Sequence, residues 1–207
     1  MIRQEALGNL IGPQPMIIIG IGANLSNPDF GSPRANCGAA LEKLVKLGCG
    51  VGSRSPWYKS EPVPASDQPW YVNGVVELKT SLDPIDLMHC LLEIELDFGR
   101  RRSGHNSPRT LDLDILAYHN LIIESLANDR SQLQIPHPRM HLRSFVISPL
   151  CDIFPKWVHP KLELSAEQLQ DRLRQSVWHA RLMRTLERWR CIWLRSESGT
   201  MRAVQFC

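Results

Sequence analysis

The chain has 207 residues, of which 43% are hydrophobic and 22% charged, and this suits one compact globular domain with extensions at its ends. Its longest apolar run, residues 16–19, is too short for a membrane span or a signal-peptide core, so we expect a cytoplasmic protein without membrane attachment. The net charge of +3 argues little for a nucleic-acid partner, because residues 172–202 alone hold eight arginines against two glutamates.

Taken in chain order, the sequence predicts strands and helices from residue 16 onwards. Residues 1–15 show no sustained period and are expected to form a loose extension. The first buried strand follows, and Ser32 with Pro33 marks the start of a helix that runs up to Gly48. A second strand is expected over residues 50–59, a proline-rich extended loop over 61–65, and a third strand over 71–80.

The second half of the predicted domain begins with Asp83 and Pro84, which mark a helix that ends at Gly99. Residues 110–118 alternate between apolar and polar and predict a fourth strand, followed by a turn at 119–120 and a helix over about 140–152. The order β-α-β-β-α-β is typical of a ferredoxin-like α+β sandwich with a mainly antiparallel sheet.

Two acids in the fourth predicted strand, Asp112 and Asp114, leave the same face about 6.6 Å apart along the strand. Such a pair could hold one or two Mg²⁺ ions, and the alternative is a solvated face whose charges pair with neighbouring arginines. A short loop upstream is rich in guanidinium groups, which favours a polyphosphate site in which arginines and Mg²⁺ share the phosphate oxygens. These arginines are Arg100, Arg101, Arg102 and Arg109.

Four motifs, in the same order, are similar to those of the 6-hydroxymethyl-7,8-dihydropterin pyrophosphokinases of folate biosynthesis. They are Ile-Gly-Ile-Gly-Ala-Asn-Leu at 19–25, Asp-Gln-Pro-Trp-Tyr-Val-Asn at 67–73, Pro-Arg-Thr-Leu-Asp-Leu-Asp at 108–114 and Ile-Pro-His-Pro-Arg-Met at 135–140. The resemblance covers about residues 16–155 and implies the ferredoxin-like core with further helices on the other side of the sheet.

The resemblance implies a role for each matching residue. It assigns Asp112 and Asp114 to the metal, and makes them catalytic together with Arg102 and Arg109. It assigns the ATP phosphates to Arg100, Arg102, Arg109, His137 and Arg143, and places Glu95 near the nucleoside. A pterin needs aromatic faces and an amide edge, which the resemblance places at Ser60, Val63, Tyr71, Asn73 and Phe145.

The implied reaction is an Mg²⁺-dependent transfer of pyrophosphate from ATP to the hydroxymethyl oxygen of the pterin, which releases AMP. Two alternatives remain open: another Mg²⁺-dependent phospho- or nucleotidyl-transfer enzyme, and a non-catalytic binding module that docks through its basic tail. The sequence departs from the family at Asn106 and Ser107, where an aromatic residue and a glycine often stand, and at Pro138, an aromatic residue in some members.

The C-terminal residues 166–207 form a separate extension of the predicted domain, which spans 16–165. Leucines and tryptophans from Leu169 to Trp193 recur near helical spacing among arginines and predict a basic amphipathic helix. We expect it to pack on its own domain or on a partner subunit rather than on a membrane surface. Six cysteines without metal-ligand spacing are expected to be reduced, and the protein is expected to be a monomer.

Overall fold

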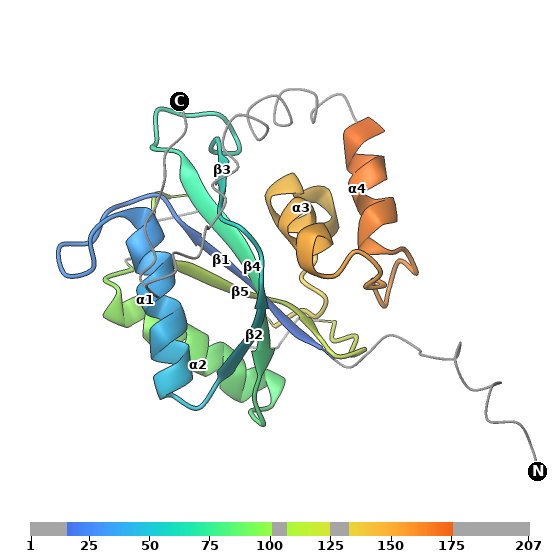
Figure 1. Ribbon diagram of the computed structural model, residues 1–207, viewed down its shortest axis with the longest axis horizontal. Helices are drawn as coiled ribbons and strands as arrows, with labels where there is room; N and C mark the ends of the chain where they lie inside the picture. The colour runs from blue at the N-terminus through green and yellow to red at the C-terminus, as the bar shows by residue number, and fades with distance from the viewer. Residues whose placement is uncertain (1–15, 101–106, 125–132, 176–207) are drawn as a thin grey trace, which may run out of the picture.

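The structure, a computed structural model, describes residues 16–100, 107–124 and 133–175 (Figure 1). The strands are β1 (Ile17–Ala23), β2 (Gly50–Arg54), β3 (Tyr58–Ser60), β4 (Tyr71–Lys79) and β5 (Asp112–Tyr118). The helices are α1 (Pro33–Lys46), α2 (Pro84–Asp97), α3 (Ser144–Ile153) and α4 (Ala166–Gln175), and a short 3-10 turn, η1, covers Met140–Leu142.

One sheet organises the domain. Its strands lie in the order β2-β4-β1-β5, β3 adds to the free part of β4, and each pairing between described strands is antiparallel. Helices α1 and α2 cover one face and α3 and α4 the other (Figure 1). The predicted ferredoxin-like α+β core, with helices on both sides of the sheet, is therefore confirmed.

Both predicted helix starts are confirmed in atomic detail. The Ser32 hydroxyl accepts a hydrogen bond from the backbone N–H of Ala35 at 3.3 Å, and Pro33 occupies the first turn of α1. The Asp83 carboxylate accepts from the backbone N–H groups of Ile85 and Asp86, each at 2.9 Å, at the start of α2. These side chains satisfy backbone donors that have no partner within the helix.

A β-bulge in β5 changes which face its residues occupy. Ile18 pairs with Ala117 and Ile19 with Ile115, so Leu116 is left without an opposite residue on β1. Leu116 and Ala117 therefore both join the core under α3 and α4, although Ile115 belongs to the core under α1 and α2. The bulge also frees the carbonyl of Leu116, which accepts a hydrogen bond from the backbone N–H of His137 at 2.9 Å.

Two predicted elements are divided in the structure. The strand expected over 50–59 is split into β2 and β3, because Ser55 turns aside and exchanges hydrogen bonds with the backbone of Val75 through both its N–H and its hydroxyl. The helix expected over 140–152 begins only at Ser144, because Arg143 has extended backbone angles (φ −114°, ψ 109°) that separate η1 from α3.

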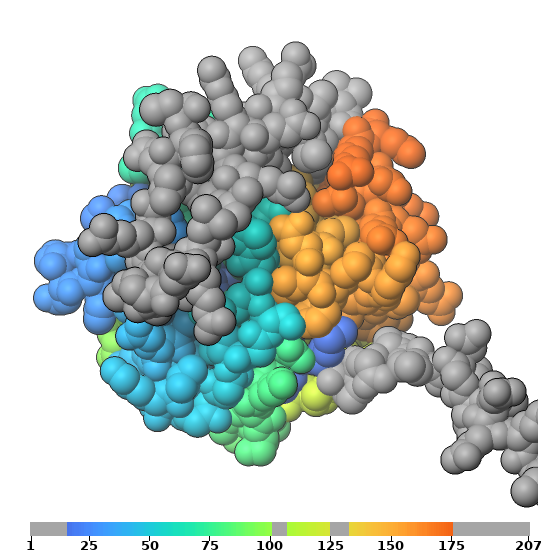
Figure 2. Space-filling model, viewed as in Figure 1, coloured from blue at the N-terminus to red at the C-terminus, as the bar shows by residue number. Residues whose placement is uncertain are grey.

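Helix α4 extends the core on the side of α3. Leu169 and Leu173 are buried there together with Leu150 of α3, and the side chains of the two helices form one continuous surface in Figure 2. For residues 166–175, the expectation that the C-terminal segment packs on its own domain is thus confirmed. Residues 1–15 and the rest of the predicted basic helix lie outside the described residues. No helix in the described ranges is long and apolar enough to cross a membrane.

Candidate active site

The candidate site lies where β1 ends and β4 and β5 begin, on the face of the sheet that α3 partly covers. Gly22 of β1 pairs with Asn73 on one side and with Asp112 on the other, so these three residues form a row across the sheet. In antiparallel pairs, opposite residues point to the same face. Since two strand spacings are about 10 Å, the backbones of Asn73 and Asp112 stand about that far apart on the two sides of Gly22.

The glycine at position 22 keeps the space between these two side chains open. A Cβ atom there would lie 3.0 Å from Oδ1 of Asn73 and 3.9 Å from Cβ of Asp112. Any larger residue would therefore press against Asn73, which is buried and donates a hydrogen bond to the Ser60 hydroxyl at 2.8 Å. We call the strip of the sheet at Gly22, between the side chains of Asn73 and Asp112, the central groove.

Arginines from three segments converge on the acid pair. Asp112 forms ion pairs with Nη1 of Arg100 at 2.8 Å and with Nη1 of Arg109 at 2.9 Å. Asp114 lies 3.9 Å from Nη1 of Arg143. The alternative of a strand face whose charges are paired with arginines predicted the two ion pairs of Asp112. Together with Arg143 at Asp114, three guanidinium groups lie beside the two carboxylates.

Glu95 of α2 supports this cluster from below. Its side chain is 1% exposed, forms an ion pair with Arg100 and accepts a hydrogen bond from the backbone N–H of Leu113 at 2.7 Å. Burial raises its pKa to about 7, which the Arg100 guanidinium partly opposes. In this arrangement Glu95 orients the Arg100 side chain. The predicted contact of Glu95 with a nucleoside stays a prediction.

Asp114 is the less neutralised acid of the pair. Burial and the neighbouring charge of Asp112 raise its pKa to about 6, although three nearby arginines act in the opposite direction. A cation would relieve this repulsion. Within the described ranges, no group of three or more His, Cys, Asp or Glu side chains could hold a metal ion. Two carboxylates nevertheless fit Mg²⁺, which keeps several waters and binds through one or two carboxylates together with substrate phosphates.

His137 approaches the cluster from the segment that the bulge in β5 anchors. Its Nδ1 accepts a hydrogen bond from the backbone N–H of Arg139 at 3.1 Å, so the neutral ring carries its proton on Nε2 and can donate there. Burial and the charges of Arg143 and Arg139 lower its pKa to about 4. A neutral imidazole with a donor on Nε2 could bind a phosphate oxygen, and this role, which the resemblance assigns to His137, stays a prediction.

The residues predicted to bind a pterin are partly brought together. Tyr71, the first residue of β4, lies two residues before Asn73 on the same face, and Ser60 of β3 is hydrogen-bonded to Asn73. Phe145 of α3 lies beneath the Arg143 guanidinium, whose carbon is 5.5 Å from the ring centre. Val63 is exposed in the loop between β3 and β4. Arg102 lies outside the described residues.

Sequence reasoning gave no role to two asparagines that hold the site together. Asn24, almost fully buried, accepts a hydrogen bond from the backbone N–H of Arg109 at 2.7 Å and donates to the carbonyl of Pro69 at 3.1 Å. Asn36 of α1 donates to the carbonyls of Leu25 and Thr110. A sequence does not tell which distant backbone group an amide will contact. The one signal available for Asn24 was its place within the motif at 19–25.

Two acids beside three guanidinium groups, next to a glycine that a buried amide flanks, resemble the polyphosphate sites used in metal-assisted phosphoryl transfer. The comparison with protein families agrees with this class. Residues 18–155 match the model of the 7,8-dihydro-6-hydroxymethylpterin-pyrophosphokinase family, and the chain belongs to this family.

Similar proteins carry the corresponding names. A 2-amino-4-hydroxy-6-hydroxymethyldihydropteridine pyrophosphokinase of Synechocystis sp. is 38% identical over 162 residues, which is 78% of each chain. The protein of that name from Haemophilus influenzae is 41% identical over 150 residues, or 72% of this chain and 88% of the relative. A folic acid synthesis protein of Dictyostelium discoideum is 34% identical over 75% of this chain, which spans only 22% of that longer protein.

Solved structures support the fold. The HPPK-DHPS protein of Plasmodium falciparum, crystallised with pteroate, superposes with a TM-score of 0.58 at 12% sequence identity. The match covers 92% of this chain and 49% of the Plasmodium chain, so this chain spans about half the length of that protein.

Proposed function

We propose that the central groove transfers a pyrophosphoryl group from ATP to the hydroxymethyl oxygen of 6-hydroxymethyl-7,8-dihydropterin, as the family of the chain implies. The observation that carries the proposal is the row of Asn73, Gly22 and Asp112. The two flanking strands are about 10 Å apart, and they hold a buried amide, suited to the edge of a pterin, and a carboxylate, suited to a metal, on the two sides of the glycine. This spacing suits a pterin on one side and the phosphates of ATP on the other.

The pterin side of the groove is proposed to consist of Asn73, Tyr71 and Phe145, with Ser60 and Val63 at the edge. Asn73 keeps Ser60 as a partner for its Nδ2, so its remaining polar atoms are available to pair with the pterin amide. A buried amide left unpaired is costly, so this residue would discriminate strongly between a pterin and a ring that lacks matching donors and acceptors.

The phosphate side is proposed to consist of Arg100, Arg109, Arg143 and His137, with Arg102 as a further candidate. Without nucleotide, Arg100 and Arg109 are paired with Asp112. Phosphate oxygens offer the same bidentate geometry as a carboxylate, so these guanidinium groups can turn from Asp112 to the triphosphate. The exchange would release Asp112 for a metal at the moment when the nucleotide enters.

Asp112 and Asp114 would hold Mg²⁺, which we propose is two ions. When bound, the metal neutralises charge on the β- and γ-phosphates and fixes their orientation. In the reaction, the hydroxymethyl oxygen forms a bond to the β-phosphorus and loses its proton. The bond from the β-phosphorus to the oxygen bridging the α- and β-phosphates breaks, and that oxygen leaves with AMP. The arginines stabilise the charge that develops on both groups.

The nucleotide product separates this reaction from its rivals. Incubation with ATP, Mg²⁺ and 6-hydroxymethyl-7,8-dihydropterin, followed by chromatography of the nucleotides, should give AMP in step with pterin consumption. Formation of ADP would identify a simple kinase, and formation of pyrophosphate a nucleotidyl transferase. Unchanged ATP with folded protein would leave the non-catalytic binding module as the better account.

Two further expectations belong to this proposal. The enzyme is proposed to act in the cytoplasm, which suits the free thiols of Cys37, Cys49, Cys90 and Cys151 in the described ranges. The expected monomer stays a prediction, and light scattering on the purified full chain would test it.

A further inference from the structure

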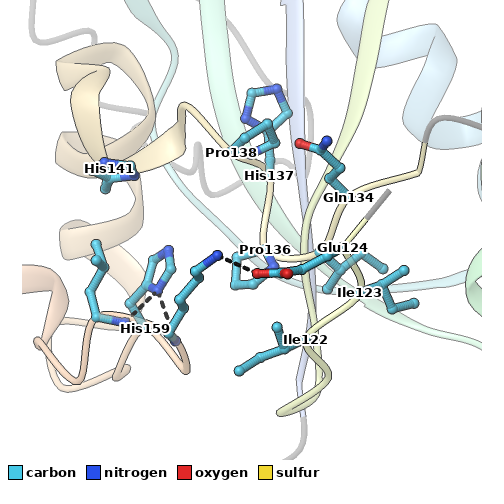
Figure 3. Close-up of a pocket in the computed structure, with 12 residues that line it drawn as sticks. Ile122, Ile123, Glu124, Gln134, Pro136, His137, Pro138, His141 and His159 are labelled. Atoms are coloured by element: carbon cyan, nitrogen blue, oxygen red, sulfur yellow. Dashed lines mark hydrogen bonds and ion pairs between the residues drawn. The ribbon is translucent and has the colours of Figure 1, made fainter. Parts of the chain in front are cut away.

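A cavity lies against the segment that carries His137, and His137 is one of its lining residues (Figure 3). Its volume of about 400 Å³ lies within the range of small-molecule sites. Half of its twelve lining residues are apolar, among them Ile122, Ile135, Pro136 and Leu162. Its polar groups include His159 and Lys161, in the turn between α3 and α4.

His159 is a fixed hydrogen-bond donor in the wall of this cavity. Its side chain is 3% exposed, and its Nδ1 accepts hydrogen bonds from the backbone N–H groups of Lys161 and Leu162, each at 3.2 Å. The neutral ring must then carry its proton on Nε2. Figure 3 shows Nδ1 turned to this backbone and the other ring nitrogen on the opposite side, toward His141.

The Nε2–H of His159 meets no hydrogen-bond acceptor within the described part of the chain. This nitrogen is not shielded from its surroundings, because the described side-chain atoms that are both buried and without a partner belong to Asn36, Thr110 and His119. An acceptor supplied by a ligand can therefore reach it. Lys161 adds a positive charge at the rim, where its ammonium group pairs with Glu124 at 2.5 Å. Only one of its three protons is needed for that contact.

We propose that this cavity binds a small aromatic carboxylate. The flat ring would lie between the apolar walls formed by Ile122, Pro136 and Leu162, and the carboxylate would accept hydrogen bonds from Nε2–H of His159 and from Lys161. A carboxylate matches this arrangement better than a neutral group, because its two oxygens can accept from both donors at once. The cavity shares His137 with the phosphate side of the central groove, but its two proposed donors, His159 and Lys161, take no part in the proposed reaction.

The test uses 2-naphthoate as the probe and the full chain, with binding followed by the fluorescence of the naphthalene ring. We expect one saturable site with a submillimolar Kd that saturating ATP and Mg²⁺ leave unchanged. The uncharged analogue 2-naphthamide should bind at least about tenfold more weakly, as for the loss of a hydrogen bond to a charged group.

Two variants decide which residues are responsible. His159→Asn keeps an acceptor for the two backbone N–H groups and removes the Nε2–H donor, so it should weaken 2-naphthoate about tenfold. Lys161→Met should weaken it as well, and it decides the matter if His159→Asn does not fold. Lys156→Met is the matched control, since Lys156 is an exposed lysine in an ion pair with Glu167 and lies outside the cavity lining.

Three results would overturn the proposal. The first is the absence of saturable binding, and the second is displacement of 2-naphthoate by ATP, which would place the probe in the central groove. The third is an equal Kd for the wild type and folded variants of His159 and Lys161. If the wild-type protein forms no AMP but still binds 2-naphthoate, the result counts against the proposed reaction and leaves the cavity proposal standing.

Discussion

Replacement of Gly22 by alanine adds a single methyl group to the central groove and tests whether the position of the Asn73 amide matters for activity. The added Cβ would lie 3.0 Å from Oδ1 of Asn73, a few tenths of an ångström closer than such contacts normally are. Asn73 cannot yield freely because Ser60 accepts its Nδ2 proton at 2.8 Å. The amide must therefore move out of its position for the pterin or lose that hydrogen bond, which costs roughly 1 kcal/mol.

The expected loss in kcat/KM for the pterin is about tenfold to a hundredfold, because small displacements of a positioning group have effects of this size. The Kd for ATP, measured by calorimetry without pterin, should change much less. The free energy of unfolding should fall by no more than about 1 kcal/mol, since Gly22 has no positive φ and alanine is acceptable in a strand.

Gly38→Ala is the matched control for this variant. Gly38 lies inside α1, and a Cβ there would meet no atom within 4 Å. The change should leave kcat/KM unaltered and raise the free energy of unfolding by about 0.5–1 kcal/mol. The reasoning fails if folded Gly22→Ala keeps wild-type kcat/KM for the pterin, or if its ATP affinity falls as far as its pterin affinity.

Three other predictions use different parts of the structure. Asp112→Asn and Asp114→Asn should fold and lose most AMP formation, because an amide lacks the charge that binds Mg²⁺; near-native rates at limiting Mg²⁺ would contradict this role. Asn73→Ala should weaken the pterin far more than ATP in calorimetry, and equal losses would argue against the pterin pocket. Burial lowers the pKa of His159 from its ordinary 6.5 to about 4. Between pH 6.5 and pH 4, this histidine is therefore protonated in the unfolded chain and neutral in the folded chain. The free energy of unfolding should therefore fall by up to roughly 3 kcal/mol as the pH drops from 6.5 to 4. Denaturant titrations of His159→Asn should show a shallower pH dependence, and an unchanged slope would rule out this histidine as a cause.

The sequence predicted those features that depend on local pattern. Alternation in residues 110–118 placed Asp112 and Asp114 on one face, and the caps at Ser32 and Asp83 marked both helix starts. The bulge at Leu116 was not predictable in this way, because the residues around it are all apolar and give no sign of which one lacks an opposite partner.

Long-range contacts account for most of what remained hidden. Asn24 meets a backbone group 85 residues away, and Asn36 meets one 74 residues away, so only the folded chain reveals either partner. Glu95 was expected near the nucleoside from the resemblance, whereas the hydrogen bond that it accepts from Leu113 depends on how α2 lies against β5. The break at Arg143 likewise reflects a tertiary contact, since its guanidinium group reaches toward Asp114 and over Phe145.

The central claim is that the pterin attacks the β-phosphorus of ATP within the central groove, and isotopic labelling tests it most directly. With ATP labelled separately at the α- or the β-phosphorus, the enzyme, Mg²⁺ and 6-hydroxymethyl-7,8-dihydropterin should give a pterin product that carries the β-label and AMP that carries the α-label, in equal amounts. An α-label in the pterin product, or a product that contains the γ-phosphate without the β-phosphate, would contradict the account.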